Sequence, residues 1–155
     1  MNHRRSIRLQ GYDYSQSGAY FVTVCAQGRE CLFGGIENSE MMLNECGCVV
    51  RDEWLRTAEI RAEIQTGEFV VMPNHFHGIV IIDPGTAVMG RGTARRAHTM
   101  ERFGQPISGS LPTIIRAFKS AVTKRINEIR QLPGVPVWQR NYYEHVIRNE
   151  ADYGQ

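Results

Sequence analysis

The sequence predicts one α+β domain over residues 1–155, in which helices cover one face of an antiparallel sheet. Its length leaves room for a single domain, and 42% hydrophobic with 22% charged residues is an ordinary globular composition. Strand-like and helix-like segments follow the order strand, helix, strand, strand, helix, strand. That order fits the ferredoxin-like split arrangement.

In the first half of the chain, β-branched and aromatic residues predict a strand over residues 19–25. Residues 29–44 are polar and rich in glycine, which predicts a loop with room for a short strand. Asn44 is a good N-cap for a helix over residues 45–62. The apolar residues of this helix recur at helical spacing, and they are Val49, Val50, Trp54, Leu55, Ala58 and Ile60.

A hairpin is predicted in the middle of the chain. Residues 68–72 and 75–82 are both strand-like, and Pro73-Asn74 between them is a typical turn sequence. Residues 84–106 follow the hairpin and show no periodicity. We therefore expect a long flexible loop there, and loops of that length are usually functional or disordered.

The last third of the chain predicts a second helix and an extended segment. An apolar stripe over residues 111–129 predicts the helix, and the proline-containing stretch 133–136 breaks it. Residues 137–147 are expected to be extended or a strand. Asn149 would cap a further helix with Glu150 in its first turn, but only six residues follow. We expect a last helix cut short at the C-terminus, and a frayed natural terminus is the alternative.

Membrane and secreted classes are not favoured. The longest apolar runs, residues 69–72 and 79–82, are far from the ~18–20 residues of a membrane-spanning helix. The basic N-terminus MNHRRSIRLQ is not followed by an apolar core, so no secretory signal is predicted. We expect a cytoplasmic protein whose cysteines are reduced thiols, namely Cys25, Cys31, Cys46 and Cys48.

Charge is unevenly distributed along the chain. Residues 37–68 hold eight acids and three arginines, whereas residues 89–148 hold eleven lysines and arginines against three acids. Such asymmetry points to a polyanionic partner. The alternative is two solvated surfaces of opposite sign.

His75 and His77 are the strongest candidates for chemistry. Side chains alternate along a strand, so both imidazoles face one side and Phe76 faces the other. Two imidazoles on one face can bind a divalent cation, and a further oxygen ligand would favour Mg²⁺ or Mn²⁺. The alternative is a polar strand surface without a metal.

Residues 71–80, which read VMPNHFHGIV, resemble the signature of the single-tyrosine HUH transposases. The most similar group is the REP-associated tyrosine transposases with their insertion-sequence relatives. The letters HUH denote two histidines around a hydrophobic residue, here His75, Phe76 and His77. This part of the resemblance is the most specific.

The resemblance extends over residues 12–153, apart from the long loop. Residues 20–25 are similar to the family's first strand. Leu43-Asn44 and Trp54 fall where its first helix belongs. Residues 137–149 are similar to the segment that leads into the family's catalytic helix.

The resemblance implies an HUH endonuclease fold, a ferredoxin-like sheet that usually works as a dimer on single-stranded hairpin DNA. It implies cleavage by a tyrosine hydroxyl, which leaves a 5′-phosphotyrosine link and a free 3′-OH. His75 and His77 would hold Mg²⁺ or Mn²⁺ on the phosphate. A cytoplasmic, nucleoid-associated location follows from such a substrate.

The nucleophile is where this sequence departs from the family pattern. The family tyrosine lies about two turns after the Arg-Asn pair that matches Arg148-Asn149, which places it beyond Gln155. Tyr153 matches a tyrosine about six residues earlier, so it would act only as a substitute. The alternative function is therefore a truncated or catalytically inactive DNA-binding module.

Cations and aromatic rings outside the histidine motif are candidates for DNA contact, because guanidinium groups contact phosphates and tyrosine rings stack on unpaired bases. One group forms a basic N-terminal arm, which could equally be a disordered tail: Arg4, Arg5, Arg8, Tyr12 and Tyr14. A second group, for which solvated charge is the alternative, comprises Arg95, Arg96, Lys119, Lys124 and Arg125.

Tyr142 and Tyr143 are weaker candidates as nucleophiles, since an extended segment should commit one of the two rings to the core. His145 is more simply structural than a partner of the metal site. Cys46-Gly-Cys48 has metal-like spacing but no second cysteine pair, so zinc is not favoured.

Overall fold

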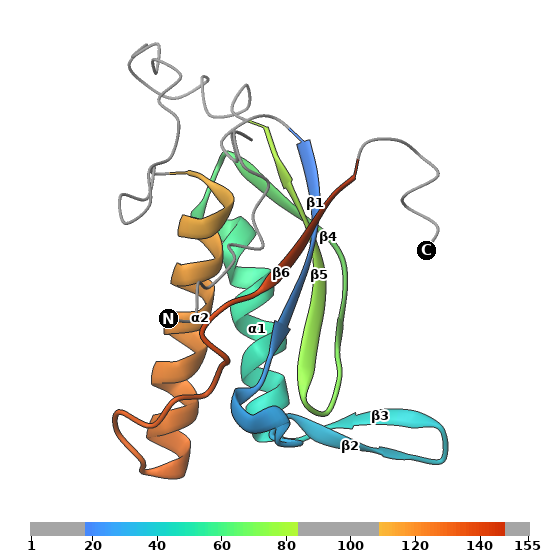
Figure 1. The fold of residues 1–155 in the computed structure, drawn as a ribbon, viewed down its shortest axis with the longest axis vertical. Coiled ribbons are helices and arrows are strands. Elements are labelled where there is room, and N and C mark those ends of the chain that lie inside the picture. The colour runs from blue at the N-terminus through green and yellow to red at the C-terminus, as the bar shows by residue number, and fades with distance from the viewer. Residues whose placement is uncertain (1–17, 84–108, 148–155) are drawn as a thin grey trace, which may run out of the picture.

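The computed structural model describes residues 18–83 and 109–147, which form a four-stranded sheet, two helices and a two-stranded ribbon (Figure 1). The sheet has the strand order β4-β5-β1-β6, and every neighbouring pair is antiparallel. A short 3-10 turn lies at Gln27–Arg29. The remaining elements are β1 (Gly18–Cys25), β2 (Gly34–Glu37), β3 (Glu40–Leu43), α1 (Glu45–Ile60), β4 (Ile64–Val71), β5 (His75–Ile82), α2 (Leu111–Arg130) and β6 (Tyr143–Ile147).

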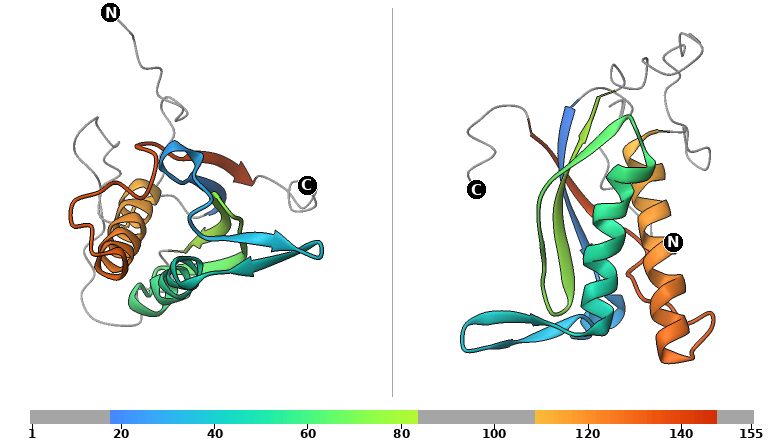
Figure 2. Two further views of the ribbon diagram at one scale, coloured as in Figure 1. Left: turned by 90° about the horizontal axis from the view of Figure 1, so that it is seen from below. Right: turned by 180° about the vertical axis from the view of Figure 1, so that it is seen from behind.

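Both helices lie side by side against one face of the sheet, and the opposite face carries neither of them (Figure 2). Together with the antiparallel pairing, this layering confirms the predicted α+β class with helices on one face. The strand order is that of the ferredoxin-like split arrangement. The face without helices, called the open face below, carries His75 and His77.

The core lies between the sheet and the helices. Val22 and Val24 of β1 alternate toward the helices and are fully buried. Trp54 of α1 is the largest fully buried side chain, and its ring centroid lies 4.8 Å from that of Phe76 and 5.2 Å from that of Phe118. Because Phe76 belongs to β5, this aromatic cluster fixes the orientation of the strand that carries the two histidines.

The first helix begins as predicted. Oδ1 of Asn44 accepts a hydrogen bond from the amide of Gly47 at 2.9 Å, which satisfies one of the free donors at the helix start. The helix ends at Ile60, two residues before the predicted end, because Arg61 already has extended backbone angles. The second helix ends at Arg130, because the left-handed φ of 56° at Gln131 terminates the helical path.

The strand before the histidines is longer than predicted. It begins at Ile64, four residues ahead of the predicted strand over 68–72. Its pairing with β5 shifts register between Thr66 and Phe69, which marks a β-bulge. A bulge interrupts the alternation of side chains, so the sequence pattern reveals only the second half of this strand.

The structure also differs in detail from the predictions for residues 29–44 and 137–147. The predicted loop over 29–44 contains the whole β2–β3 ribbon, whose turn residues Asn38 and Ser39 have φ values of 50° and 65°. Left-handed angles at both turn residues suit a tight hairpin, and Asn adopts them readily. Of the predicted segment 137–147, the last five residues form β6, and Trp138 forms a separate antiparallel bridge with Ala26.

Three predictions fall outside the described residues: the loop over 84–106, the basic arm within residues 4–14, and the helix start at Asn149. In the part of the chain that the structure describes, neither helix combines the length and the apolarity that crossing a membrane requires.

Candidate functional site

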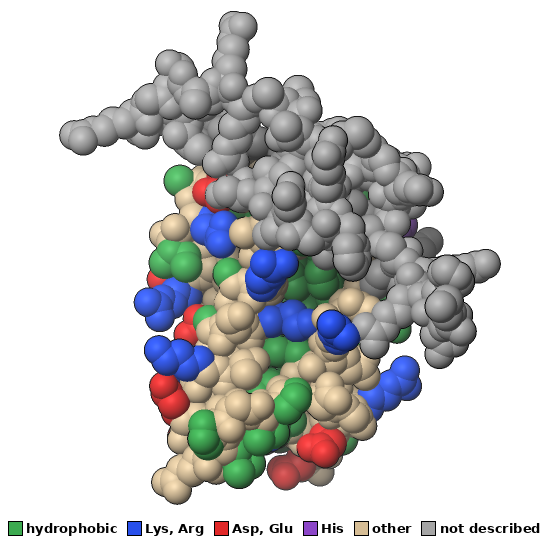
Figure 3. Space-filling view, turned by 60° about the vertical axis from the view of Figure 1, so that its left-hand side comes forward, with side chains coloured by type: hydrophobic (Ala, Val, Ile, Leu, Met, Phe, Trp, Pro, Cys, Tyr) green, Lys and Arg blue, Asp and Glu red, His purple; other side chains and the backbone are tan. Residues whose placement is uncertain are grey.

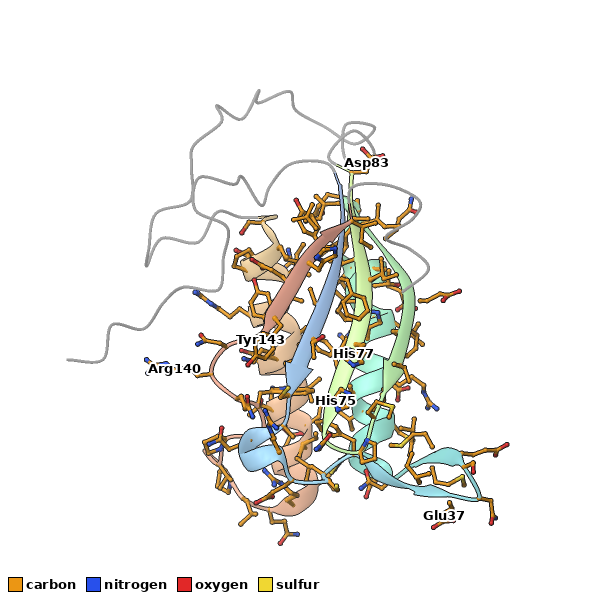
Figure 4. The ribbon with its side chains drawn as sticks, turned by 45° about the vertical axis from the view of Figure 1, so that its right-hand side comes forward. Glu37, His75, His77, Asp83, Arg140 and Tyr143 are labelled. Atoms are coloured by element: carbon orange, nitrogen blue, oxygen red, sulfur yellow. The ribbon has the colours of Figure 1, made fainter. Side chains whose placement is uncertain are left out.

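The two histidines lie on the open face of the sheet. His75 and His77 point away from the helices, whereas Phe76 between them is fully buried in the core. Figure 4 shows the two residues one above the other along β5. Their ring centroids are 4.6 Å apart with the ring planes at 77°. The predicted alternation along this strand is thus confirmed.

Asn74 holds the ring of His75. Nδ1 of His75 lies 2.7 Å from Oδ1 of Asn74, and Nδ2 of Asn74 donates to the carbonyl of Arg29 at 3.3 Å. Because the Asn74 amide nitrogen is directed at Arg29, its oxygen faces the imidazole and accepts the hydrogen of Nδ1. Nε2 of His75 then carries the lone pair, which is the arrangement that a metal requires.

Thr23 and Phe21 hold the ring of His77. Nδ1 of His77 lies 2.7 Å from Oγ1 of Thr23, the residue directly across the β1–β5 pairing. The imidazole also stacks on Phe21, with centroids 5.3 Å apart and an interplanar angle of 24°. Burial, and secondarily the charge of His75, lowers the pKa of His77 below its usual value. A lowered pKa favours the neutral imidazole, the form that can bind a metal.

The donor set supports a cation but does not complete its coordination. Both Nδ1 atoms are engaged by the protein, so the Nε2 atoms of His75 and His77 remain for a ligand. Within residues 18–83 and 109–147, no third His, Cys, Asp or Glu joins them in a cluster that could hold a metal. Two imidazoles bind several divalent metals, so the choice between Mg²⁺, Mn²⁺ and others rests on further ligands.

Tyr143 shares the open face with the histidines. By register Thr23 of β1 is paired with His77 on one side and with Tyr143 of β6 on the other, which forms one row across three strands. The Tyr143 side chain is 56% exposed, whereas Tyr142 is 8% exposed and belongs to the core. The segment therefore commits one tyrosine to the core, as predicted. His145 lies on the same face, paired with Phe21.

The three predicted DNA contacts on α2 have different surroundings. Lys119 donates from Nζ to the carbonyls of Gln139 at 2.7 Å and Arg140 at 3.3 Å, and burial lowers its pKa. Nη1 of Arg125 donates to Oε1 of Glu53 at 2.9 Å. Lys124 is exposed. Lys119 and Arg125 thus have structural partners that the sequence pattern did not suggest.

The other predicted site residues lie outside the part of the chain that the structure describes, namely Tyr153, Arg4, Arg5, Arg8, Tyr12, Tyr14, Arg95 and Arg96. Conversely, the structure adds Asn74, Thr23 and Phe21 as residues that orient the imidazoles. Asn74 could have been found because it directly precedes His75. The other two become neighbours of His77 only through strand register, which the sequence does not state.

Comparison with known proteins adds one close relative. No protein-family model matches the chain. A protein of Haemophilus influenzae (strain ATCC 51907 / DSM 11121 / KW20 / Rd), described as uncharacterized, is 40% identical over 156 residues. The match spans 100% of this chain and 84% of the Haemophilus protein. At this identity and coverage the two chains belong to one family.

Two solved structures share the fold. One is a REP-associated tyrosine transposase bound to a REP hairpin, with 19% identity and a TM-score of 0.51 over 94% of this chain and 65% of that one. The other is a candidate transposase from Deinococcus radiodurans R1, with 13% identity and a TM-score of 0.52 over 94% and 91% of the two chains. This chain belongs to the family of the uncharacterized Haemophilus protein, and its fold is that of the REP-associated tyrosine transposases.

Proposed function

We propose that this chain is a DNA-processing protein of the transposase type, which binds single-stranded hairpin DNA and breaks and rejoins its strands. The observation that carries the proposal is the pair His75 and His77, two oriented imidazoles on the open face of the sheet. Support comes from the fold, which is shared with a transposase whose structure contains a REP hairpin. The chain spans 65% of that transposase, so activity, DNA substrate and partners are all part of the proposal.

His75 and His77 would hold Mg²⁺ or Mn²⁺ through their Nε2 atoms. Such a cation, when bound, polarises a phosphoryl oxygen and neutralises negative charge on the phosphate. The task of Asn74 and Thr23 is to fix the two rings with their Nδ1 atoms turned toward the protein. The lowered pKa of His77 keeps that ring neutral and available near neutral pH.

Strand cleavage requires a tyrosine hydroxyl on the open face. Its oxygen would form a bond to the scissile phosphorus, and the departing 3′-oxygen would leave as a free 3′-OH. The 5′-phosphotyrosine link conserves the energy of the broken bond, so the strand can be rejoined without a high-energy cofactor. Tyr153 is the sequence-based candidate for this role, and Tyr143 is the exposed tyrosine in the row of His77.

The DNA strand would be held by cations that contact its phosphates. The N-terminal and loop arginines predicted as phosphate contacts, together with Lys124, would supply this sequence-independent affinity. We further propose that the protein works as a homodimer in the cytoplasm, in association with the nucleoid.

The decisive experiment is a covalent-adduct assay. The purified chain is mixed with a labelled hairpin oligonucleotide carrying a single-stranded flank and Mn²⁺, then separated on a denaturing gel. We expect a protein–DNA adduct that EDTA, His75→Ala or His77→Ala abolishes. His145 is on the same face but on β6, which β1 separates from β5, so His145→Ala is the matched control that should retain the adduct.

Variants of the two tyrosines identify the nucleophile. Loss of the adduct in Tyr153→Phe or in Tyr143→Phe assigns the attacking hydroxyl. Hairpin binding without any adduct in the unmodified chain would contradict cleavage and establish the alternative, a catalytically inactive DNA-binding module. Absence of both adduct and salt-sensitive hairpin binding would exclude DNA as the substrate.

Direct titration with Mn²⁺ tests the metal site independently of DNA. We expect the His75→Ala variant to lose binding and Thr23→Val to weaken it about 10–100-fold, because Thr23 only orients a ligand. Equal affinity in the unmodified chain and in both variants would rule out the histidine pair as the site.

A further inference from the structure

The β2–β3 ribbon, residues 34–43, is a projecting arm. It extends away from the sheet and both helices, beyond the end of the sheet where β5 begins (Figures 1 and 2). By register, Ile36 is paired with Met41 on one face of the arm, and Glu37 is paired with Glu40 on the other face, which also carries Met42. Ile36 is 54% exposed. A two-stranded ribbon with an uncovered apolar face is marginally stable in water, so this arm needs a partner surface.

A groove on the opposite side of the molecule has complementary chemistry. It is a cavity of about 750 Å³ between the C-terminal half of α2 and the segment 133–140. Pro133, Val135 and Pro136 provide apolar lining, and Lys124 and Arg140 provide positive charge. Figure 3 shows lysine and arginine side chains gathered around apolar ones on the face that carries α2. The groove can therefore accept a ligand that is both apolar and acidic.

Four charged side chains on the two surfaces form no ion pair with the described residues. Among residues 18–83 and 109–147, Glu37 and Glu40 on the arm take part in no ion pair, and neither do Lys124 and Arg140 at the groove.

The arm does not reach the groove of its own chain. Glu37 and Arg140 lie on opposite sides of the molecule in Figure 4, and the views in Figures 1 and 2 place the arm on the side away from α2. Any contact between the two surfaces therefore joins two molecules.

We propose that the arm of one copy docks into the groove of a second copy of this chain. Ile36 and Met41 pack on Pro133, Val135 and Pro136, while Glu37 and Glu40 meet the positive charges at the rim. The contact is head-to-tail, so it joins copies into a ring or an open chain, and it does not depend on the DNA-processing function. A nucleic acid fits the groove less well, because its lining is largely apolar and includes the carboxylate of Glu128.

Charge reversal combined with sedimentation velocity tests the proposal. The unmodified chain is expected to self-associate as its concentration rises. Reversing the arm with Glu37→Lys and Glu40→Lys should shift the mass to that of the monomer, and so should reversing the groove with Lys124→Glu and Arg140→Glu. The chain with all four substitutions should associate again, because the new charges are once more complementary.

Matched controls separate this contact from a general effect of charge. Glu59→Lys on α1 and Arg116→Glu on α2 change exposed residues outside both surfaces and should leave association unchanged. Ile36→Ser should weaken association without a change of charge.

A chain that stays monomeric at every concentration would overturn the proposal. Association that survives both reversals would do the same. If the groove reversal abolished binding of a single-stranded oligonucleotide but left association intact, the groove would be a nucleic-acid contact instead of a docking site for the arm.

Discussion

The two faces of β5 differ in almost every property, although neighbouring residues of one strand build them. Phe76, Val80 and Ile82 point toward the helices and are at most 1% exposed. His75 and His77 point the other way, onto a face that neither helix covers, and their rings are held by hydrogen bonds and, for His77, by stacking on Phe21. The covered face thus contributes burial, and the open face contributes polar groups in fixed orientations.

Because the buried and the polar residues lie on opposite faces of the sheet, substitutions can change stability and metal binding separately in this domain. Burial of apolar side chains is the main stabilising contribution, and here it lies on one side of the sheet. Substitutions on the covered face should change the free energy of unfolding and leave the histidine pair in place. Substitutions on the open face should change metal binding with little effect on unfolding.

The largest expected effect comes from the centre of the covered face. Trp54→Ala removes a fully buried ring that contacts Phe76 and Phe118, and should lower the free energy of unfolding by about 3–5 kcal/mol. Urea unfolding measures the change. Leu55→Ala, the next residue on the same helix and 45% exposed, is the control and should change it by about 0.5 kcal/mol. Equal losses of unfolding free energy in Trp54→Ala and Leu55→Ala would contradict the view that stability comes from burial on the covered face.

A glycine on the covered face should have the next largest effect. A Cβ at Gly78 would lie 2.8 Å from ring atoms of both Phe76 and Trp54, closer than real contacts allow. Gly78→Ala should therefore destabilise the fold by about 1–3 kcal/mol through overpacking. Gly35→Ala, where nothing lies within 4 Å of the new Cβ, is the matched control and should have little effect. Thermal unfolding measures the stability of both variants. Equal midpoints for Gly78→Ala and Gly35→Ala would show that the Cβ at Gly78 is not overpacked.

The ion pair between the helices should give a smaller loss. Glu53 is 6% exposed, and Arg125 satisfies its carboxylate from α2 at 2.9 Å. Arg125→Ala should lower the free energy of unfolding by about 1 kcal/mol, since the arginine itself is partly solvated. Lys124→Ala is the exposed control. A strong loss of hairpin binding in Arg125→Ala, without any loss of stability, would instead support the predicted phosphate contact.

The sequence predicted the covered face better than the open one, and the reason is physical. Alternation along β5 and the cap at Asn44 are local patterns, so the fold class and the orientation of the two histidines could be anticipated. The contact of Thr23 with His77 joins residues 54 positions apart and follows from strand register. The bulge after Thr66 interrupts alternation, and the hairpin turn at Asn38 is short and polar, so both resemble loop in a sequence.

The smallest expected effect is a dependence of stability on pH that originates on the open face. In the folded chain the pKa of His77 lies below its usual 6.5, because burial and then the charge of His75 disfavour the imidazolium. Above pH 6.5 the ring is neutral in both states, and the full stability is present. As the pH falls below that value, the unfolded chain takes up the proton first, so the folded state loses stability until its own lowered pKa is passed.

Urea unfolding of the metal-free chain in EDTA, at about pH 7.5 and about pH 5, measures this effect. His77→Gln removes the titrating ring, so the unmodified chain should lose more stability on acidification than the variant does. His145→Gln removes another imidazole of the same face and is the control for the substitution itself, measured at about pH 7.5. If His77→Gln lost as much stability as the unmodified chain, the imidazole would not be desolvated. The open face would then be more hydrated around His77 than its stacking on Phe21 and its hydrogen bond to Thr23 imply.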